Sequence, residues 1–466
     1  MLEAQGAVPA WIMPLARVWQ NLNPASPKFD VIIIDEASQA DITALPLLYF
    51  GKKVIIVGDD KQVSPAAVGV TAADITHLQS VTIEGVIKHA SLYTMDTSLY
   101  DIAQMNFTAR MLTEHFRCVP EIIGYSNKLA YDGRIRPLRE SGSGPLEPLV
   151  AVEVAGGVRE PGKKRNLVEA EAIVAQLAAC LKEPAYAGKS FGAISLLGDE
   201  QAKLIRDLAA EKIGISELEA CGFLCGNPGN FQGDERDVIF LSLVDSSVEN
   251  ETAESQQLRL VGEGHGGDTA KRYNVAVSRA RDQLWVFHSM KLAELKPGDL
   301  RRDLIEYVQS PQLPAAAADK EPGSLEIAVA AALQGRGYCL RRQVLVGSLE
   351  LPLVVEGDGH RALLVMQGEH WVDSIQAAAE ERCNQAILER LGWQFIRVRG
   401  SEWYLDPEAA LEKIIGNLES LGIAPQADEA IAADSQAART ELLTYVRGAA
   451  EKIRAKWHAP AGEEAI

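Results

Sequence analysis

The stretch "FDVIIIDEASQADI", from Phe29 to Ile42, joins a run of apolar residues to two adjacent carboxylates, Asp35 and Glu36. The run is short and lacks the alternation of a half-buried strand, which is typical of a strand covered on both faces of a parallel sheet. Further along the chain, "KVIIVGD", "FGAISLLG" and "DVIFLSLV" show the same pattern. Helical patterns such as "NLVEAEAIVAQLAACLKE" lie between these strands, so this part of the chain predicts an α/β fold built on parallel sheets.

The composition is that of an ordinary soluble protein. The chain has 466 residues, of which 47% are hydrophobic and 24% are charged, and this length suffices for more than one domain. No apolar run approaches the roughly 20 residues of a membrane-spanning helix, and the first residues lack the basic-then-apolar pattern of a signal peptide. We therefore expect a cytoplasmic protein without a membrane partner.

The net charge and the spacing of the cysteines argue against two classes of ligand, polyanions in general and zinc. The net charge of -18 argues against general binding of polyanions. A groove with a locally basic lining could still hold nucleic acid, because the local field decides such binding. Cys221 and Cys225 lie close together with no second pair nearby, which predicts reduced buried thiols rather than a zinc site.

Ligands of open parallel sheets bind beyond the carboxyl ends of the strands, and the two carboxylates lie at such an end. Adjacent carboxylates at this place suit nucleotide hydrolysis. At such an edge Asp35 could hold Mg²⁺, and Glu36 could orient and deprotonate the attacking water. Gln62 follows the neighbouring strand in "GDDKQ", where it could touch the γ-phosphate or the water. The alternative for an acidic pair at the end of a strand is an ordinary turn.

Five motifs in one order then resemble those of superfamily 1 helicases, in the group that contains the nonsense-mediated-decay helicase and its bacterial relatives. "DEASQ" and "GDDKQVSP" resemble motifs II and III. "LTEHFRCVPEIIGYSN", "GNFQGDERDVIFLSLV" and "KRYNVAVSRARDQLWVFHS" resemble motifs IV, V and VI. The resemblance implies two RecA-like lobes, residues 1–110 and 111–310. The first lobe is expected to be incomplete, with a partly exposed sheet.

The resemblance also implies roles for individual residues. Arg117 and Arg279 match the arginine fingers that neutralise the charge on the γ-phosphoryl oxygens, and the alternative for an isolated arginine is a solvated surface charge. The catalytic candidates are Asp35, Glu36, Gln62, Arg117 and Arg279, and together with Glu235 they are expected to converge on one cleft between the lobes. The candidates for nucleotide contact, in the motif V loop, are Gln232, Gly233 and Glu235; the candidate metal ligand is Asp35. The candidates for coupling or strand contact, each of which could equally be a cap or turn residue, are Ser38, Ser64, Asn274 and Ser278.

The phosphate-binding P-loop that this chemistry normally needs, G-x-x-x-x-G-K-[ST], is missing from the sequence. Gly188-Lys189-Ser190 is the nearest approach, but Glu183 stands where the first glycine belongs. A helix is expected before this stretch and a strand after it. A phosphate-binding loop has the reverse order, because it connects a strand to the start of a helix. We therefore expect the chain to be the C-terminal portion of a larger helicase, inactive alone, with the P-loop upstream or on a partner chain.

A Pro- and Ala-rich linker, residues 311–323, leads to a second resemblance. Residues 324–422 resemble the very-short-patch-repair type of endonuclease domain within the PD-(D/E)xK class, with the order helix, three strands, helix, strand, helix. Glu326 matches the acid on the family's first helix. The family's metal-binding acids, however, are replaced by Leu351 or Pro352 and by Val365 and Gln367. Val and Gln cannot replace carboxylate ligands, so the resemblance implies an inactive, degenerate nuclease-like domain.

Other residues of this domain leave alternatives open. The nearby acids Glu356, Asp358 and Glu369 are out of register with the family's metal site. The residues that could bind DNA ends or structured strands, or belong to the core, are Arg397, Arg399, Trp371, Trp393 and Trp403. Residues 423–466 are expected to be a polar tail, with a helix in part but too little apolar periodicity for a core.

The leading functional hypothesis is an ATP-dependent helicase portion that couples Mg-ATP hydrolysis to movement along single-stranded DNA or RNA, in the 5′ to 3′ direction by family resemblance. The alternative is a non-catalytic nucleic-acid-binding or regulatory module that keeps the fold without turnover. The missing P-loop favours the alternative for the chain alone. The acids and the arginines favour the first hypothesis.

Overall fold

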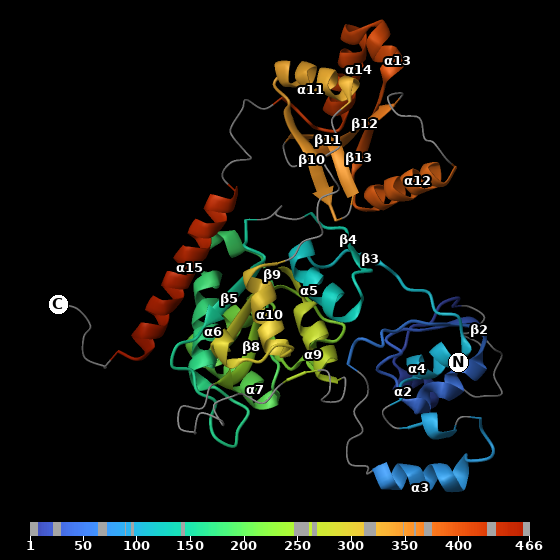
Figure 1. Cartoon of the computed structure of the whole chain (residues 1–466), viewed down its shortest axis with the longest axis vertical. Helices are drawn as coiled ribbons and strands as arrows, with labels where there is room; N and C mark the ends of the chain where they lie inside the picture. Colours follow the sequence, from blue (N-terminus) through green and yellow to red (C-terminus); the bar gives the residue numbers. More distant parts are fainter. Residues whose placement is uncertain are drawn as a thin grey trace.

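Three bodies follow one another along the chain in the computed structural model (Figure 1). The structure describes residues 8–21, 29–63, 72–88, 90–94, 97–140, 145–246, 261–262, 268–311, 323–347, 349–357, 360–367, 375–425 and 435–459. No helix within these ranges combines the length and apolar character needed to cross a membrane.

The middle body is built on a fully parallel sheet of five strands in the order β5-β9-β8-β6-β7. The strands are β5 (Leu149–Glu153), β6 (Phe191–Ser195), β7 (Leu224–Gly226), β8 (Arg236–Ser246) and β9 (Ala280–Ser289). The helices are α5 (Pro120–Ala130), α6 (Leu167–Leu181), α7 (Asp199–Lys212), α8 (Ile215–Ala220), α9 (Asp268–Val277) and α10 (Leu300–Gln309), with the short turns η3 (Pro184–Tyr186), η4 (Pro228–Phe231) and η5 (Leu292–Glu294).

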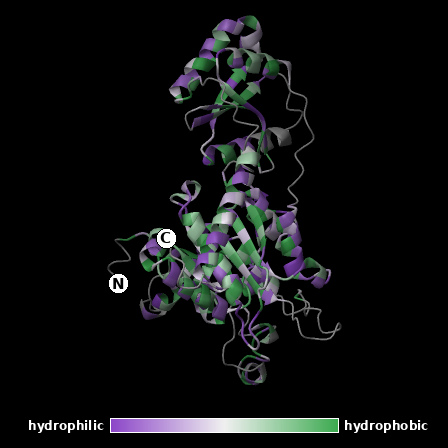
Figure 2. Cartoon of the chain, turned by 90° about the vertical axis from the view of Figure 1, so that its left-hand side faces the viewer, coloured by the Kyte–Doolittle hydropathy of each residue, from purple (hydrophilic) through white to green (hydrophobic). Residues whose placement is uncertain are grey.

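Apolar clusters cover both faces of this sheet. On one face α5, α9 and α10 pack against residues such as Ile239 and Leu284, and on the other α6 and α7 pack against residues such as Phe240 and Trp285. Figure 2 shows the hydrophobic residues gathered along the central strands. The predicted α/β fold with a buried parallel sheet is therefore confirmed here, because continuous apolar strands need cover on both sides.

The N-terminal body holds the acidic pair on a smaller sheet. Its strands β1 (Phe29–Ile34) and β2 (Gly51–Ile56) pair in parallel, from Phe29 opposite Gly51 to Ile34 opposite Ile56. One face packs on η1 and α4, whereas Ile33 and Ile55 on the other face are 66% and 50% exposed. The expected partial exposure of this sheet is confirmed. The accompanying helices are α2 (Leu15–Asn21), η1 (Ile42–Phe50), α3 (Ala72–Thr82), η2 (Ala90–Leu92) and α4 (Leu99–Asn106).

The third body has a four-stranded sheet in the order β10-β11-β12-β13. The first two pairings are antiparallel and the last is parallel, and the element order is the one predicted for the nuclease-like domain. Its strands are β10 (Cys339–Val346), β11 (Leu349–Gly357), β12 (His360–Gln367) and β13 (Gln394–Arg399). Its helices are α11 (Ser324–Gly335), α12 (Ile375–Arg390), α13 (Gly400–Leu405) and α14 (Pro407–Ser420). Trp393 and Trp403 are buried in its core, whereas Trp371, Asp358 and Glu369 lie outside the described residues.

The C-terminal segment is not simply the polar tail that we expected. Helix α15 (Ser435–Trp457) returns to the middle body and packs along α6 (Figure 1). Val446 is fully buried there, and Arg454 and His458 both contact the carboxylate of Glu171. The apolar face of this helix is difficult to recognise in the sequence because many of the surrounding residues are alanines. The residues that recur on this face at helical spacing are Leu442, Val446, Ala450, Ile453 and Trp457.

Candidate active site

The carboxyl ends of β1 and β2 place the acidic pair at the edge of the small sheet. The amide of Val57 donates to the carbonyl of Ile34, and the amide of Ala37 donates to the carbonyl of Val57, each at 2.8 Å. Glu36 has a φ of 51°, a left-handed conformation that costs a non-glycine residue roughly 1 to 2 kcal/mol. This turn leaves the side chains of Asp35 and Glu36 both exposed beyond the strand.

Local hydrogen bonds orient the two carboxylates. Asp35 Oδ1 accepts from the amide of Glu36, and Glu36 Oε2 accepts from Gln39 Nε2, each at 2.9 Å. Ser38 beside them is buried, and its Oγ has no partner in the described part of the chain. Exposed carboxylate oxygens are hard donors of the kind that Mg²⁺ takes, so Asp35 and Glu36 fit the metal that the resemblance implies.

The loop after β2 connects the N-terminal and middle bodies. Asp59 Oδ2 accepts from Gln62 Nε2 at 2.9 Å and from the hydroxyl of Tyr131 at 2.6 Å. Asn274 Nδ2 donates to that same hydroxyl at 3.0 Å and to the carbonyl of Lys61 at 2.9 Å. Burial and the Asp59 carboxylate raise the pKa of Tyr131, so its hydroxyl stays protonated and keeps donating across the gap.

Arg279, just after α9, crosses the same gap and is only 3% exposed. Its guanidinium donates to the carbonyl of Val275 at 3.1 Å, to the carbonyls of Phe231 and Asp234 at 3.4 Å, and to Gln62 Oε1 at 3.4 Å. Burial and the neighbouring Arg117 lower the pKa of Arg279, whereas the Glu36 carboxylate raises it. The Glu36 carboxylate and the Arg117 guanidinium are therefore both near enough to Arg279 to affect its charge.

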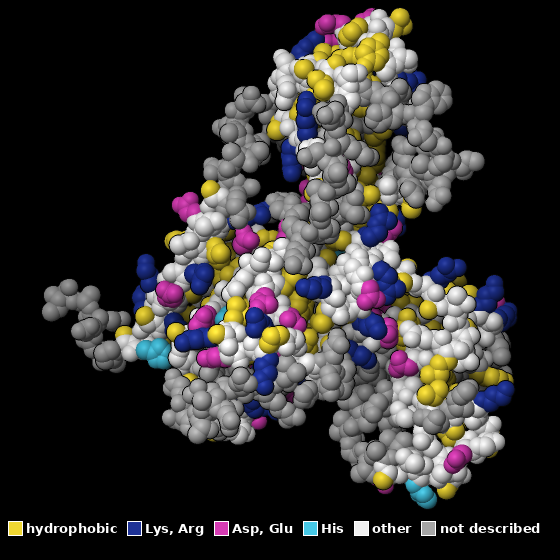
Figure 3. Space-filling view, viewed as in Figure 1, with side chains coloured by type: hydrophobic (Ala, Val, Ile, Leu, Met, Phe, Trp, Pro, Cys, Tyr) yellow, Lys and Arg dark blue, Asp and Glu magenta, His cyan; other side chains and the backbone are white. Residues whose placement is uncertain are grey.

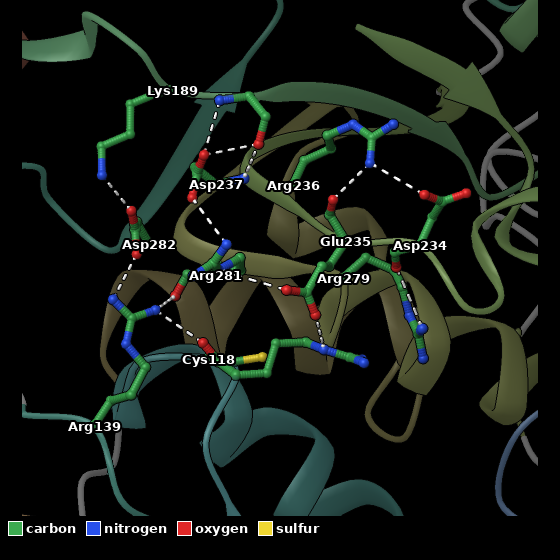
Figure 4. Close-up of polar contacts among 12 residues, drawn as sticks. Cys118, Arg139, Lys189, Asp234, Glu235, Arg236, Asp237, Arg279, Arg281 and Asp282 are labelled. Atoms are coloured by element: carbon green, nitrogen blue, oxygen red, sulfur yellow. Dashed lines mark hydrogen bonds and ion pairs between the residues drawn. The ribbon is translucent and has the colours of Figure 1, made fainter. Parts of the chain in front are cut away.

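Arg117 and the motif V loop belong to the middle body and lie beside Arg279. Arg117 Nε forms an ion pair with Glu235 Oε2. The other oxygen of Glu235 lies 3.7 Å from Arg281 Nε, and Figure 4 shows that carboxylate pointing toward Arg281. Gln232 Nε2 donates to the carbonyl of Val63 at 3.0 Å. Gly233 has a φ of 80°, which explains why the turn needs glycine.

His115 lies beside the arginines and was not identified from the sequence. Burial and the positive charges of Arg117, Arg279 and Arg139 lower its pKa to about 4. The neutral ring therefore accepts from the amide of Cys118, at 3.0 Å from Nε2. His115 stands inside the "HFR" of motif IV, and this position is the signal that could have identified it.

Gly188-Lys189-Ser190 has a structural role in the middle body, as the reversed order of helix and strand predicts. Lys189 Nζ lies 2.6 Å from Asp282 Oδ2, and Ser190 Oγ donates to Asp237 Oδ2 at 2.7 Å (Figure 4). The stretch connects η3 to β6, and its cation and hydroxyl both have structural partners. It is not a P-loop.

The structure brings most of the predicted residues together, and their catalytic roles stay predictions. Gln62, Gln232 and Arg279 make contacts between the two bodies, and Arg117 and Glu235 pair beside them. Asp35 and Glu36 lie at the end of β1 and make no direct contact with the arginines among the interactions described, so their convergence with the arginines on one cleft stays a prediction. Ser278 caps its own helix by donating to the carbonyl of Val275, and Ser64 lies outside the described residues.

Charge is mixed over the surface around these bodies. Figure 3 shows acidic and basic side chains interspersed on the visible face, without a single continuous basic field.

Comparison with known families finds three matches along the chain. Residues 17–68 and residues 95–291 each match a family described as an AAA domain. Residues 325–418 match the endonuclease-like family REase_MTES_1575. The matches fall on the N-terminal body, the middle body and the third body.

Curated relatives of the chain are helicases. It is 24% identical, over 83% of its length and 36% of the relative, to an uncharacterized ATP-dependent helicase (MG140 homolog) of Mycoplasma pneumoniae. It is 27% identical to the helicase sen1 of Schizosaccharomyces pombe, over 62% of this chain and 16% of the relative. It is 25% identical to the human DNA replication ATP-dependent helicase/nuclease DNA2, over 55% of this chain and 24% of the relative. The chain spans about a third or less of the length of these relatives.

Proposed function

This chain carries the AAA domains of a superfamily 1 helicase similar to sen1 and a C-terminal endonuclease-like domain, and from that premise we propose that it supplies the acids and arginines of an ATP-driven translocase. Its nucleotide would be Mg-ATP, and its track would be single-stranded DNA or RNA. The observation that carries the proposal is the contact of Arg279 with Gln62, which joins the arginines of one lobe to the strand end of the other. Strand-stimulated ATP turnover that is lost in Glu36→Gln would test it.

The residues have separate tasks in this proposal. Asp35 would hold Mg²⁺, which neutralises phosphate charge when bound. Glu36 orients the attacking water and takes its proton, because its carboxylate is exposed and already held by Gln39. Arg117 and Arg279 stabilise the charge that spreads over the γ-phosphoryl oxygens, since a planar guanidinium matches such oxygens well.

Coupling to movement would pass through Gln62. Its amide nitrogen donates to Asp59, and its amide oxygen accepts from Arg279. Asp59 in turn accepts from Tyr131, which belongs to the second lobe. In this proposal Gln62 touches the γ-phosphate while it is bonded to Asp59 and to Arg279. Departure of the phosphate would then shift Gln62 and change the contact between the lobes.

The phosphate cradle is the part that these residues do not supply. The 466 residues contain no G-x-x-x-x-G-K-[ST] sequence, and the nearest match has structural partners instead. We propose that further sequence or a partner polypeptide provides it. The alternative proposal, a regulatory module without turnover, is favoured by this same feature and would leave ATP turnover at the background level even when a P-loop is supplied.

The nuclease-like domain is proposed to have kept its fold without its chemistry. Leu353 in β11 stands opposite Leu364 in β12, so Leu351 or Pro352 lies near Val365, and these are the positions where the resemblance implies acids. Gln367 stands opposite Arg399 at the end of the sheet. Within the described residues, no group of three or more His, Cys, Asp or Glu could hold a metal ion.

We expect the purified chain not to cleave single-stranded, double-stranded or forked DNA in Mg²⁺ or Mn²⁺. The physical reason is that apolar and amide side chains cannot replace the carboxylate ligands that these ions need. The measurement is product formation on a gel, compared between the unsubstituted chain, Glu326→Ala and the control Glu389→Ala. Cleavage that disappears in Glu326→Ala but persists in Glu389→Ala would show that other acids complete a working site.

A further inference from the structure

The segment that carries Arg117 is a two-stranded strap between the middle body and the nuclease-like domain (Figure 1). We define the strap as residues 113–117 and 136–140. Its core is the parallel pair β3 (Glu114–His115) and β4 (Arg136–Pro137). The amide of Arg136 donates to the carbonyl of Thr113 at 2.7 Å, and the amide of Leu138 donates to the carbonyl of His115 at 2.8 Å. Backbone hydrogen bonds therefore join the two halves of the strap.

The inner face of the strap contacts the candidate active site. Arg117 pairs with Glu235, and His115 lies among the arginines. Arg139 Nη1 donates to the carbonyl of Arg117 at 2.8 Å and to the carbonyl of Arg281 at 2.9 Å, while its Nη2 reaches Asp282 Oδ1 at 2.7 Å (Figure 4). Arg139 thus connects the backbone of Arg117 to β9, the strand within motif VI.

The outer face of the strap contacts the nuclease-like domain. Glu114 Oε2 lies 3.1 Å from Arg390 Nη2, and the Arg390 guanidinium lies 6.0 Å from the ring centre of Phe116. Glu140 forms an ion pair with Arg361, whose guanidinium stacks 4.0 Å from the ring centre of Trp393.

The contact between the strap and the nuclease-like domain also buries apolar side chains. Leu138 is 1% exposed and belongs to the apolar cluster of the nuclease-like domain, together with Trp393, which is 2% exposed. Glu140 also forms a β-bridge with Val346 at the end of β10. Gly347 approaches so closely that a Cβ there would overlap the carbonyl oxygen of Pro137. The two backbones pack without room for a side chain between them.

The contacts of the strap divide between its two sides. Glu114, Phe116, Leu138 and Glu140 contact the nuclease-like domain, whereas Arg117 and Arg139 contact Glu235 and Asp282 of the middle body and His115 lies beside these arginines. We propose that the nuclease-like domain positions the arginine finger: docking of Gly347 and Arg361 on the outer face of the strap fixes Arg117 for ATP hydrolysis. The inference rests on the proposed function and assigns Gly347 and Arg361 as positioning residues that do not touch the nucleotide.

This arrangement gives the degenerate domain a use that needs no metal ion. A nucleic acid or protein that binds the domain and shifts it would also shift the strap. Displacement of a catalytic group by about 1 Å can cost on the order of a hundredfold in rate. Small movements of the domain are therefore sufficient to change turnover.

The test uses a pair of matched glycine substitutions. Gly347→Ala would push the strap away from the domain, whereas Gly392→Ala is the control. Gly392 lies in the same domain with a similarly positive φ of 83°, and a Cβ there meets no atom within 4 Å. Both variants therefore carry comparable backbone strain, and only the first reaches the strap. Arg361→Gln, with Arg341→Gln as its control, repeats the test without backbone strain, because Arg341 pairs with Glu356 inside the domain.

Two measurements follow each variant. The first is the pKa of His115 from histidine C2-hydrogen exchange, measured by mass spectrometry on the chain without nucleotide. It should rise from about 4 by at least about one unit in Gly347→Ala and Arg361→Gln, because a looser strap admits water. The second is strand-stimulated ATP turnover with a polypeptide that supplies the P-loop. There kcat should fall by about tenfold to a hundredfold with an unchanged KM for ATP, while both controls behave as the unsubstituted protein.

The outcomes separate the inference from the proposed function. Normal kcat in both Gly347→Ala and Arg361→Gln, in a protein where Arg117→Ala abolishes turnover, would overturn the inference alone. An equal loss in the Gly392→Ala control would also overturn it. Absence of turnover in the unsubstituted protein, even with the P-loop supplied, would overturn the proposed function and the inference with it.

Discussion

Glu36→Gln should lower strand-stimulated ATP turnover by about a hundredfold to ten-thousandfold, while ATP binding stays within about twofold, because a general base contributes on this scale to the rate. The amide has nearly the shape of the carboxylate but cannot take a proton from water. Its carbonyl oxygen can still accept the hydrogen bond from Gln39, so the turn at the end of β1 should survive. Turnover and binding are measured with a polypeptide that supplies the P-loop.

Asp30→Asn is the matched control for this prediction, since Asp30 is another exposed acid on β1 and pairs with Lys52 away from the cleft. The control should turn over ATP normally. A loss of ATP binding in Glu36→Gln that equals its loss of turnover would show that Glu36 holds the structure of the site and is not a base.

Arg279→Ala should lower kcat by on the order of a thousandfold or more, which is the scale of an arginine finger. Arg279→Lys should recover little of this loss, because an ammonium group cannot reproduce the planar fork that reaches Gln62 and the three carbonyls together. Removal of Arg279 also deletes the contact between the lobes that its guanidinium makes with Gln62. Thermal unfolding of each variant therefore accompanies the kinetics and separates misfolding from lost chemistry.

Arg302→Ala serves as the control, because Arg302 pairs with Glu306 on α10 and has no contact with the cleft in the described structure. Normal turnover in a folded Arg279→Lys would contradict the assignment. Arg279 would then be a strut between the lobes, and Arg117 would be the remaining candidate for neutralising the γ-phosphate.

The sequence predicted the middle sheet and the order of elements in the nuclease-like domain because these depend on local pattern. Continuous apolar strands such as "DVIFLSLV" can only be buried on both faces, and β8 is almost entirely buried. The motif residues could be predicted as a group because their order in the chain matches a known family. Gln62, Gln232 and Arg279 do make contacts across the lobes.

The remaining features depend on tertiary packing that no local pattern reveals. Tyr131 lies outside the motifs, and only the folded structure brings its hydroxyl to Asp59. The outer face of the strap uses Glu114, Phe116 and Leu138, which are ordinary residues until the nuclease-like domain packs on them. Helix α15 was missed as a packing element because its apolar stripe is rich in alanine, although Val446 is fully buried.

The central claim is that the acids and arginines of this cleft form one ATP-hydrolysing centre that needs a P-loop supplied from elsewhere. The most direct test is ATP turnover by the purified chain, measured with and without single-stranded nucleic acid and with and without a polypeptide carrying the P-loop. The claim predicts weak or no turnover by the chain alone, and strand-dependent turnover with the P-loop that Glu36→Gln removes. Turnover of about 1 to 100 per second by the chain alone, unchanged in Glu36→Gln, would contradict it.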